Sequence, residues 1–485
     1  MNELMISWKK ESNDKKIQYC CVLAVLLVEW MYFSPPVLDT GAAALSVDYF
    51  LVIPSGLFLL LTLRRGINRK GKAPFILGFL MLAWAVAVEV LRILFGIKYF
   101  APGIAACNYA LALPMAFALE DERRQWGITA FALLYVLTGV RLCVQAIGLI
   151  FEILPQPYST FVCWDGARLR QMFHPTSCAA LLMLGMGFCL ALCSRTKKRW
   201  LRGLLIVLVI VQFVIQSMTN GRNAVGFTSL MLGGILFCAI RGSGWKRLPV
   251  ALAVGAALTA VLFLSSQTMY SMHERQMYNE AVRQAQITRT EENAAASQAE
   301  AQEADNEVQT ASQAEPGKFL DQAGEMLAQI DEHAVLTAEN VQKSLREDLF
   351  SFNGRTTIWA EAVAGVLRHP LILLCGTDSM AEILAEGGKT RAEHTHNSCL
   401  ETLYTFGLPG MVLALAITLL TLRAGVIVLW RNTDLWKSSV AVIALGLLGS
   451  SILEPYLFAA KNYHHYFCVI FLVTVGYLHQ WSLEK

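Results

Sequence analysis

The sequence alternates long apolar runs, which carry almost no charge, with short clusters of lysine and arginine. Only 16% of its 485 residues are charged and 55% are hydrophobic, whereas a soluble protein carries about a quarter of charged residues. A helix needs about 20 apolar residues to cross a bilayer, where its backbone must satisfy its own hydrogen bonds. The pattern therefore predicts an all-α polytopic membrane protein. The net charge of +3 gives no argument for a nucleic-acid partner.

The boundaries of the apolar runs predict about twelve transmembrane helices. We place them at residues 17–34, 45–63, 74–97, 102–119, 126–151, 174–194, 201–218, 222–240, 248–265, 402–430, 437–453 and 464–482. The tenth is long enough either to begin outside the bilayer or to bend at Gly425.

The distribution of lysine and arginine predicts the orientation of these spans. With the N-terminus inside, 23 cationic residues fall on the inner side and five on the short outer loops. The five outer residues are Lys98, Arg168, Arg170, Arg222 and Lys461. Positive residues collect in cytoplasmic loops. We therefore expect a multi-pass protein of the cytoplasmic (inner) membrane with both termini cytoplasmic.

One outer segment is much longer than the other loops and divides the chain into three parts. Residues 1–265 would hold the first nine spans, residues 266–396 a large extracytoplasmic loop, and residues 397–485 the last three spans. Within the loop, residues 280–316 are rich in Ala, Gln and Glu and almost lack large apolar side chains, so we expect a disordered or loosely helical insertion. Residues 319–395 would form the helical, catalytic part of the loop.

The segment FNGRTTIWAEAVAGVLRHP predicts a short amphipathic helix in that loop. Its apolar side chains follow helical spacing from Trp359 to Leu367, and Pro370 would end the helix. Arg355 precedes Trp359 by one turn on the same face, at a helix N-terminus whose N–H groups favour an anion. Two roles for Arg355 remain open: an anion ligand, or a residue that reaches lipid headgroups from an apolar surface.

The segment RAEHTHNSCLETLYTFGLPG contains a second helix start. Ser398 and Glu401 have capping-box spacing, so a helix should begin at Ser398, and Gly407 suits its end. His396 would lie just before this helix N-terminus, which disfavours the imidazolium and suits a general base. His394 and His396 are equally compatible with solvated loop residues. Their spacing, with no further ligands, does not indicate a metal site.

Several arginines are further candidates for anion binding. Arg222 lies at the outer start of a span, where cations are disfavoured, so it is either an anion ligand or an anchor to a headgroup phosphate. Arg170 is a candidate anion contact or an ordinary loop residue. Arg92 and Arg141 fall inside spans. Glu89 lies one turn before Arg92 and can pair with it, whereas Arg141 has no such neighbour in the sequence.

In this order, the motifs resemble the O-antigen ligase and O-antigen polymerase-like superfamily. The resemblance runs from about Arg168 to Gly410. It rests on TNGRNA opening a span, GRTTIW followed by LRHP in a large outer loop, and HTHNSCLETLYTFGLPG opening the next span. The chain departs from the pattern in two places. The insertion at 280–316 is unlike a compact ligase loop, and the usual Gly-x-Gly after HP is replaced by Cys375-Gly376-Thr377-Asp378.

The resemblance implies a GT-C-like membrane glycosyltransferase. Such an enzyme takes a glycan from undecaprenyl pyrophosphate and joins it to an acceptor hydroxyl, on a glycan or a lipid, at the outer face of the cytoplasmic membrane. It would act as an O-antigen ligase or as a polymerase of surface-polysaccharide repeats. The family's paired arginines carry over to Arg222 and Arg355, and its loop histidine to His396. We expect these three to be catalytic, in an inverting displacement that needs no metal or cofactor. The expected substrate-binding residues are Arg170, Arg141, Arg391, His394 and Asn397.

Two other functions remain open. A twelve-span transporter or flippase of polysaccharide precursors fits the number of helices, although no duplicated half or pair of Gly/Pro-broken spans is evident. A non-catalytic scaffold fits the low-complexity insertion. Solute flux without a glycan product would favour the transporter. Loss of function on deletion of residues 280–316 would favour the scaffold.

Overall fold

The computed structural model describes residues 12–32, 43–66, 72–96, 125–151, 153, 162–165, 168–171, 175–219, 221–241, 247–307, 355–377, 379–387, 392, 394–431, 434–454, 456–458 and 465–484. The chain divides into two compact units. Unit 1 comprises Met1–Met272 together with Trp359–Lys485, and unit 2 comprises His273–Ile358.

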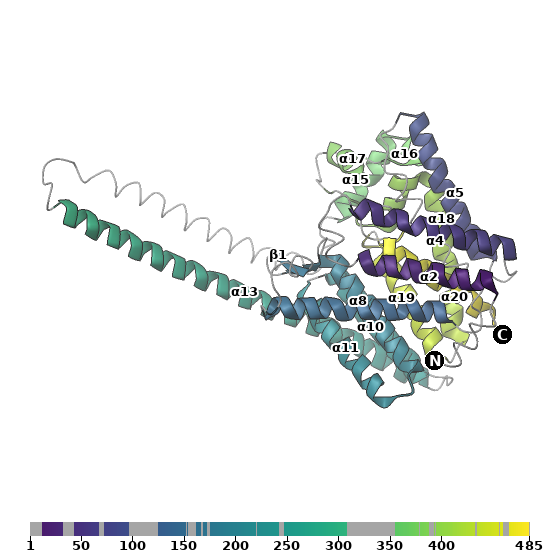
Figure 1. The fold of residues 1–485 in the computed structure, drawn as a ribbon, viewed down its shortest axis with the longest axis horizontal. Helices are drawn as coiled ribbons and strands as arrows, with labels where there is room; N and C mark the ends of the chain where they lie inside the picture. Colours follow the sequence, from purple (N-terminus) through teal and green to yellow (C-terminus); the bar gives the residue numbers. More distant parts are fainter. Residues whose placement is uncertain are drawn as a thin grey trace. The chain divides into compact units, whose positions relative to one another are not determined.

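Helices dominate the described residues, which confirms the predicted helical fold class (Figure 1). They are α2 (Asn13–Tyr32), α4 (Ala43–Arg65), α5 (Lys72–Leu94), α8 (Trp126–Ile150), α10 (Pro175–Arg195), α11 (Arg199–Met218), α12 (Arg222–Arg241), α13 (Leu248–Glu307), α15 (Arg355–Arg368), α16 (Ile372–Cys375), α17 (Met380–Glu386), α18 (Ser398–Arg431), α19 (Leu435–Ser450) and α20 (His465–Leu483).

Seven of the described helices contain a stretch long and apolar enough to cross a membrane. These stretches are Lys72–Leu94, Gly127–Ile150, Thr176–Arg195, Arg199–Met218, Arg222–Arg241, Leu248–His273 and Ser398–Arg431. Two shorter apolar helices, Leu435–Ser450 and Phe467–Leu483, accompany them. This agrees with a multi-pass membrane protein. The predicted span at 102–119 lies outside the described residues, so the number of twelve spans and the GT-C assignment stay predictions.

Helix α10 is the most deeply buried of the candidate spans. It packs against α8, α11, α12 and α19. Its side chains from Ala179 to Leu184 are fully buried, and they are small or aliphatic. Because α10 begins at Pro175 and α12 at Arg222, their packing brings the first turns of both helices together, and this is where the candidate site lies.

The loop before α10 contains a short β-hairpin that the sequence pattern did not predict. Strands β1 (Val162–Asp165) and β2 (Arg168–Gln171) pair in antiparallel register, with Cys163 opposite Arg170. Leu169 is fully buried, and β2 packs against α10 and α11. Four-residue strands are too short to show a clear alternation of apolar and polar side chains, so the pattern alone gave no signal.

The predicted ninth span continues as helix well beyond residue 265. Helix α13 is continuous from Leu248 to Glu307. Of the two expected alternatives, disordered or helical, the insertion is helical as far as it is described, up to residue 307. Ala, Gln and Glu all have high helix propensity, which accounts for this result. Residues 308–354, which include the beginning of the helical part expected at 319–395, lie outside the described part.

Helix α18 bends at Gly407 and not at Gly425. Gly407 has φ 68° and ψ −175°, which interrupts the helix. A Cβ at Gly425 would meet the side chain of Leu445 at 3.2 Å, so that glycine serves close packing on α19. Residues 408–431 are long enough, at about 1.5 Å per residue, to cross a hydrocarbon core of about 30 Å. We therefore expect residues 398–406 to lie beyond the hydrocarbon core.

The bend leaves helix carbonyls without intrahelical partners, and neighbouring elements supply donors. The backbone N–H of Thr377 donates to Tyr404 O at 2.6 Å, Nη2 of Arg92 donates to Thr405 O, and Nε1 of Trp84 donates to Phe406 O at 2.7 Å. Satisfying the last carbonyls of a helix stabilises its end, and a cation there also complements the helix dipole.

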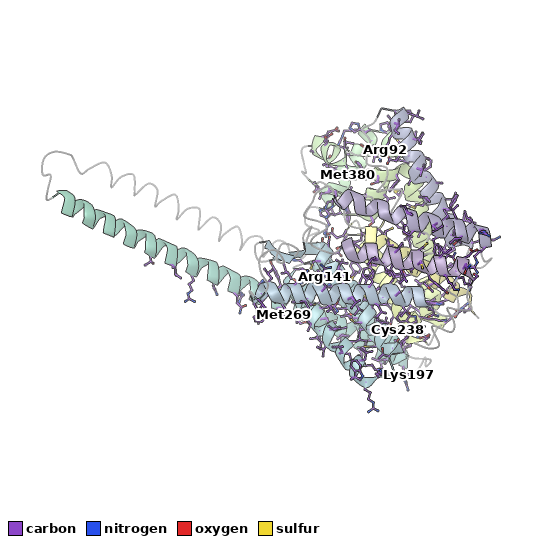
Figure 2. The ribbon with its side chains drawn as sticks, in the orientation of Figure 1. Arg92, Arg141, Lys197, Cys238, Met269 and Met380 are labelled. Atoms are coloured by element: carbon purple, nitrogen blue, oxygen red, sulfur yellow. The ribbon has the colours of Figure 1, made fainter. Side chains whose placement is uncertain are left out.

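Arg92 is fully buried and joins three elements (Figure 2). Its Nη1 pairs with Glu89 at 3.2 Å, which confirms the predicted local pair. Its Nε donates to Cys375 O at 3.0 Å, in addition to the bond to Thr405 O. The turn that replaces the usual Gly-x-Gly is therefore anchored at Cys375. Gly376 has φ 67°, and a Cβ there would lie 2.4 Å from Tyr404 O, so this turn requires glycine.

Candidate functional site

Helix α18 begins at Ser398, as predicted, but its N-cap is the preceding residue. Oδ1 of Asn397 accepts the N–H groups of Cys399 at 2.9 Å and Leu400 at 3.0 Å. The expected capping box from Ser398 is therefore wrong by one position. Asn and Ser are similarly good N-caps, so the sequence pattern alone did not separate them.

Glu401 holds the loop before the helix instead of closing a capping box. Its Oε2 accepts both the backbone N–H of Thr395 at 3.0 Å and the Thr395 hydroxyl at 2.9 Å. Thr395 O in turn accepts a hydrogen bond of 2.9 Å from Nε1 of Trp359 on α15. Thr395 is fully buried by these contacts. The contacts of Thr395 therefore fix the backbone position of the next residue, His396.

His396 forms a dyad with a carboxylate from a distant part of the chain. Its Nδ1 lies 3.3 Å from Oε2 of Glu454, whose side chain is only 4% exposed, whereas the His396 side chain is 26% exposed. No other described residue bonds the His396 ring nitrogens. A carboxylate beside Nδ1 favours the tautomer with a proton there. Nε2 then carries the lone pair that can accept a proton.

The ring of His394 contacts both the backbone and the ring of His396. The His396 N–H donates to Nδ1 of His394 at 3.3 Å, and the two ring centroids are 4.0 Å apart. His396 has φ 51°, a left-handed conformation that is uncommon for a residue other than glycine. Such strain persists where the surroundings hold the residue in place, and it is frequent at functional sites.

The sequence pattern alone did not identify Glu454 as the partner of His396. One signal was present. Glu454 is the only acidic residue between Asp434 and Glu484, in an otherwise apolar segment. An isolated carboxylate next to a span usually has a partner or a function.

The turn at 450–454, which follows α19, binds the loop that carries His396 at several points. Nδ2 of Asn397 donates to Ile452 O at 2.9 Å, the Ser398 N–H donates to Ser451 O at 3.0 Å, and the Ser398 hydroxyl donates to Glu454 O at 3.2 Å. Both the oxygen and the nitrogen of the Asn397 side-chain amide thus form hydrogen bonds within the protein. A substrate would have to compete with these bonds. Its predicted substrate-binding role stays a prediction.

The same turn also binds the start of α12. Nδ2 of Asn223 donates to Ser450 O at 3.2 Å. Arg222, which precedes Asn223, is half-buried and is the first residue of α12, as predicted. The 450–454 turn therefore connects the helix start that carries Arg222 with the loop that carries His396. Both elements belong to unit 1.

The remaining TNGRNA residues explain why the chain can turn so tightly before α12. The Gly221 N–H donates to the Thr219 hydroxyl at 3.2 Å, and that hydroxyl donates to Gln216 O at 2.7 Å. A Cβ at Gly221 would lie 2.7 Å from Cβ of Ala179, so glycine permits the close approach to α10. Gln216 Nε2 donates to Ala179 O at 2.7 Å and thereby fixes this end of α11 to α10.

Arg355 is the first residue of α15 and is half-buried, but it belongs to unit 2. From Trp359 onward the helix belongs to unit 1. It is held by the bond from Trp359 to Thr395 O and by the Tyr404 hydroxyl, which donates to Ala362 O at 2.7 Å. Helix α15 ends at Arg368, two residues before Pro370, as predicted.

The LRHP motif at the end of α15 makes structural contacts. Arg368 lies 3.3 Å from Glu386 on α17 and 3.6 Å from the buried Glu361 on its own helix. Nε2 of His369 lies 2.8 Å from Glu386. The hydrogen bond from His369 and the nearby Arg368 guanidinium hold the pKa of Glu386 below its usual value of 4.5. These residues dock α17 on α15.

The other predicted substrate-binding arginines lie on different elements. Arg141 is half-buried on α8, a helix that packs against β1 and α10 (Figure 2). Arg170 lies on β2. Arg391 lies outside the described residues. The roles of all three stay predictions.

A comparison with protein families supports the assignment that the motifs suggested. Residues 218–415 match the family model described as O-antigen ligase. The match begins at Met218, immediately before TNGRNA, and extends beyond GLPG, so it contains Arg222, Arg355 and His396. No curated protein matches the chain. The predicted resemblance to an O-antigen ligase-like family is thereby confirmed.

Proposed function

We propose that this O-antigen ligase-like membrane protein transfers a glycan from an undecaprenyl-pyrophosphate donor to an acceptor hydroxyl at the outer face of the membrane. The family match supports membrane glycan transfer by a ligase or polymerase. The observation that carries the proposal is the dyad of His396 and Glu454, fixed on the turn that also holds the start of α12.

His396 acts as the general base of this reaction. With the Nδ1 proton held by Glu454, Nε2 removes the proton of the acceptor hydroxyl as its oxygen attacks the anomeric carbon. The bond between the anomeric carbon and the phosphate oxygen breaks, and undecaprenyl pyrophosphate leaves with the electron pair. One in-line displacement of this kind inverts the anomeric configuration and leaves one proton on His396.

Arg222 and Arg355 stabilise the negative charge that develops on the pyrophosphate. Guanidinium groups bind phosphate oxygens in a bidentate manner and act more strongly where water is excluded. Arg222 also lies at the N-terminus of α12, where backbone N–H groups favour an anion. The pyrophosphate is already a good leaving group, so charge stabilisation by two arginines is sufficient without a metal.

The participation of Arg355 is part of the proposal. Arg355 and Trp359 are four residues apart on one helix, so they share a face of α15. Trp359 donates to Thr395 O, the residue next to His396. We propose that Arg355, one turn before Trp359 on α15, contacts the pyrophosphate of the bound donor.

The test is a transfer assay with purified protein in liposomes, a lipid-pyrophosphate-linked glycan and an acceptor. We expect His396→Ala, Arg222→Ala and Arg355→Ala each to lower the transfer rate by about 10²-fold or more. Arg275→Ala is the matched control, because Arg275 is an exposed cation on α13 outside the proposed site. Full-rate transfer by any of the three site variants removes that residue from the mechanism.

The same assay separates a ligase from a polymerase. Both use one donor class and differ in the acceptor. Transfer to a second lipid-linked glycan lengthens the chain on undecaprenyl pyrophosphate, whereas transfer to a different lipid or glycan acceptor moves the chain off it. Solute movement without either product would instead support the transporter.

A further inference from the structure

Helices α15 and α16 expose a row of aliphatic side chains on a segment that is too short to cross a membrane. We call Val363, Leu367, Leu371, Leu373 and Leu374 the leucine face; all five are exposed, and Leu367 reaches 79%. Isolated exposed leucines are ordinary, but five exposed aliphatic side chains within residues 363–374 indicate an interaction surface.

The opposite side of these helices is already occupied by the protein. A Cβ at Gly365 would lie 2.4 Å from the Tyr404 hydroxyl and 2.7 Å from Cγ2 of Ile383. Val366 and Ile372 are buried. Arg368 is engaged by Glu386 and Glu361. The leucine face is therefore not the side on which α15 and α16 pack in the fold.

The structure fixes the depth of the leucine face relative to the candidate spans. Gly407 is in close contact with α16, because a Cβ at Gly407 would lie 2.6 Å from Leu374 O. Gly407 separates the lipid-crossing part of α18 from residues 398–406. Nε of Arg92 binds Cys375 O, and Arg92 lies in the last turn of the candidate span α5. Helix α16 thus packs against the last turn of α5 and against α18 at its bend.

The exposed apolar surface continues from those span ends onto the leucine face. Leu94 and Phe95 are exposed at the end of α5, and Leu408 and Val412 are exposed where α18 resumes after the bend. These exposed apolar residues lie on the two candidate spans that pack against α16. This continuity points to lipid as the occupant.

We propose that the leucine face inserts among the acyl chains of the adjacent lipid leaflet, so that α15 and α16 form an interfacial membrane anchor. An amphipathic segment of this kind lies in the plane of the interface with its apolar side about 5–10 Å into the boundary between headgroups and acyl chains. The inference does not depend on the proposed reaction. It places the Thr395–Ser398 loop, which α15 holds through Trp359, at headgroup level.

The test is photocrosslinking of the full-length chain in liposomes of phosphatidylethanolamine and phosphatidylglycerol. A benzophenone amino acid replaces Leu367, and mass spectrometry detects adducts. Val412, on the lipid-crossing part of α18, is the positive control, and Glu382, an exposed residue on α17, is the matched polar control.

We expect lipid adducts at 367 with a yield similar to that at 412, and only background yield at 382. Background lipid yield at 367 alongside clear yield at 412 overturns the proposal. A crosslink from 367 to another segment of this chain, or to a second copy, also overturns it, because the leucine face would then be a protein interface.

Discussion

Nδ1 of His396 lies 3.3 Å from Oε2 of Glu454, although the two residues are 58 positions apart in the chain. Glu454 is almost fully buried and His396 is partly exposed, so the histidine, and not the carboxylate, is the member of the pair that a substrate can reach. This arrangement suits a positioning residue that acts through the histidine. It makes Glu454 testable separately from the substrate contacts.

We predict that Glu454→Gln lowers kcat of the transfer reaction by roughly 10²-fold or more and changes KM for the lipid donor little. The amide keeps the size of the side chain but removes the negative charge that holds the Nδ1 proton, so the wrong tautomer becomes available. Steady-state kinetics in liposomes measure the effect. Glu382→Gln, which alters an exposed carboxylate on α17, should retain full activity.

A double-mutant cycle distinguishes positioning from a general structural role. If Glu454 acts only through His396, then adding Glu454→Gln to His396→Ala should cause no further loss of kcat. Additive losses in the cycle would mean that Glu454 supports activity by another route.

The order of the motifs and the apolar periodicity predicted the helices and where they begin. The residues that form caps and turns were predicted less well. The helix start at Arg222 follows from the boundary of an apolar run. The start at Ser398 follows from its spacing to Glu401, although Asn397 is the N-cap. The partner of His396 did not follow, because Glu454 is brought to it only by the packing of α18 on α19. Pairings between distant residues are set by tertiary structure, and a single sequence shows only that an isolated carboxylate exists.

The bend in α18 illustrates the same limit. Gly407 and Gly425 are both compatible with an interrupted helix in sequence terms. Only the neighbouring residues decide between them. Before Gly407, Thr377, Arg92 and Trp84 donate hydrogen bonds to the last carbonyls of the helix. At Gly425, Leu445 packs closely against the helix. For the same reason Arg92 could be paired with Glu89 by spacing alone, but its bonds to Cys375 and Thr405 could not be foreseen.

We predict that Arg92→Met destabilises the protein by about 3–5 kcal/mol, because it leaves a buried carboxylate and two buried carbonyls without their donor. Thermal unfolding in mild detergent measures the loss. Glu89→Gln added to Arg92→Met should recover part of the stability, since it removes the buried carboxylate charge that Arg92 neutralises in the wild type. Wild-type stability of Arg92→Met would show that the bonds at the bend of α18 contribute little.

We predict that Gly407→Ala costs at least about 1–2 kcal/mol of stability. The residue has φ 68°, which disfavours a side chain, and the new Cβ would meet Leu374 O at 2.6 Å. Gly203→Ala on α11 is the matched control, because nothing lies within 4 Å of a Cβ there. In a helix that replacement should be neutral or stabilising by up to about 1 kcal/mol. Equal effects of the two substitutions would contradict the assigned bend.

The docking of α17 should depend on pH through Glu386. The pKa of Glu386 is held below 4.5 by the hydrogen bond from His369 and by Arg368. A carboxyl group whose pKa is lowered in the folded state contributes stability above its unfolded pKa, and this contribution is lost as the pH falls through the folded value.

We therefore expect Glu386→Gln to speed amide hydrogen exchange in residues 380–387 at neutral pH. The difference from wild type should vanish once the pH is below the lowered pKa. Exchange in residues 435–450 should be the same in both proteins throughout. A difference in residues 380–387 that persists in acid would show that Glu386 does not dock α17 through its charge.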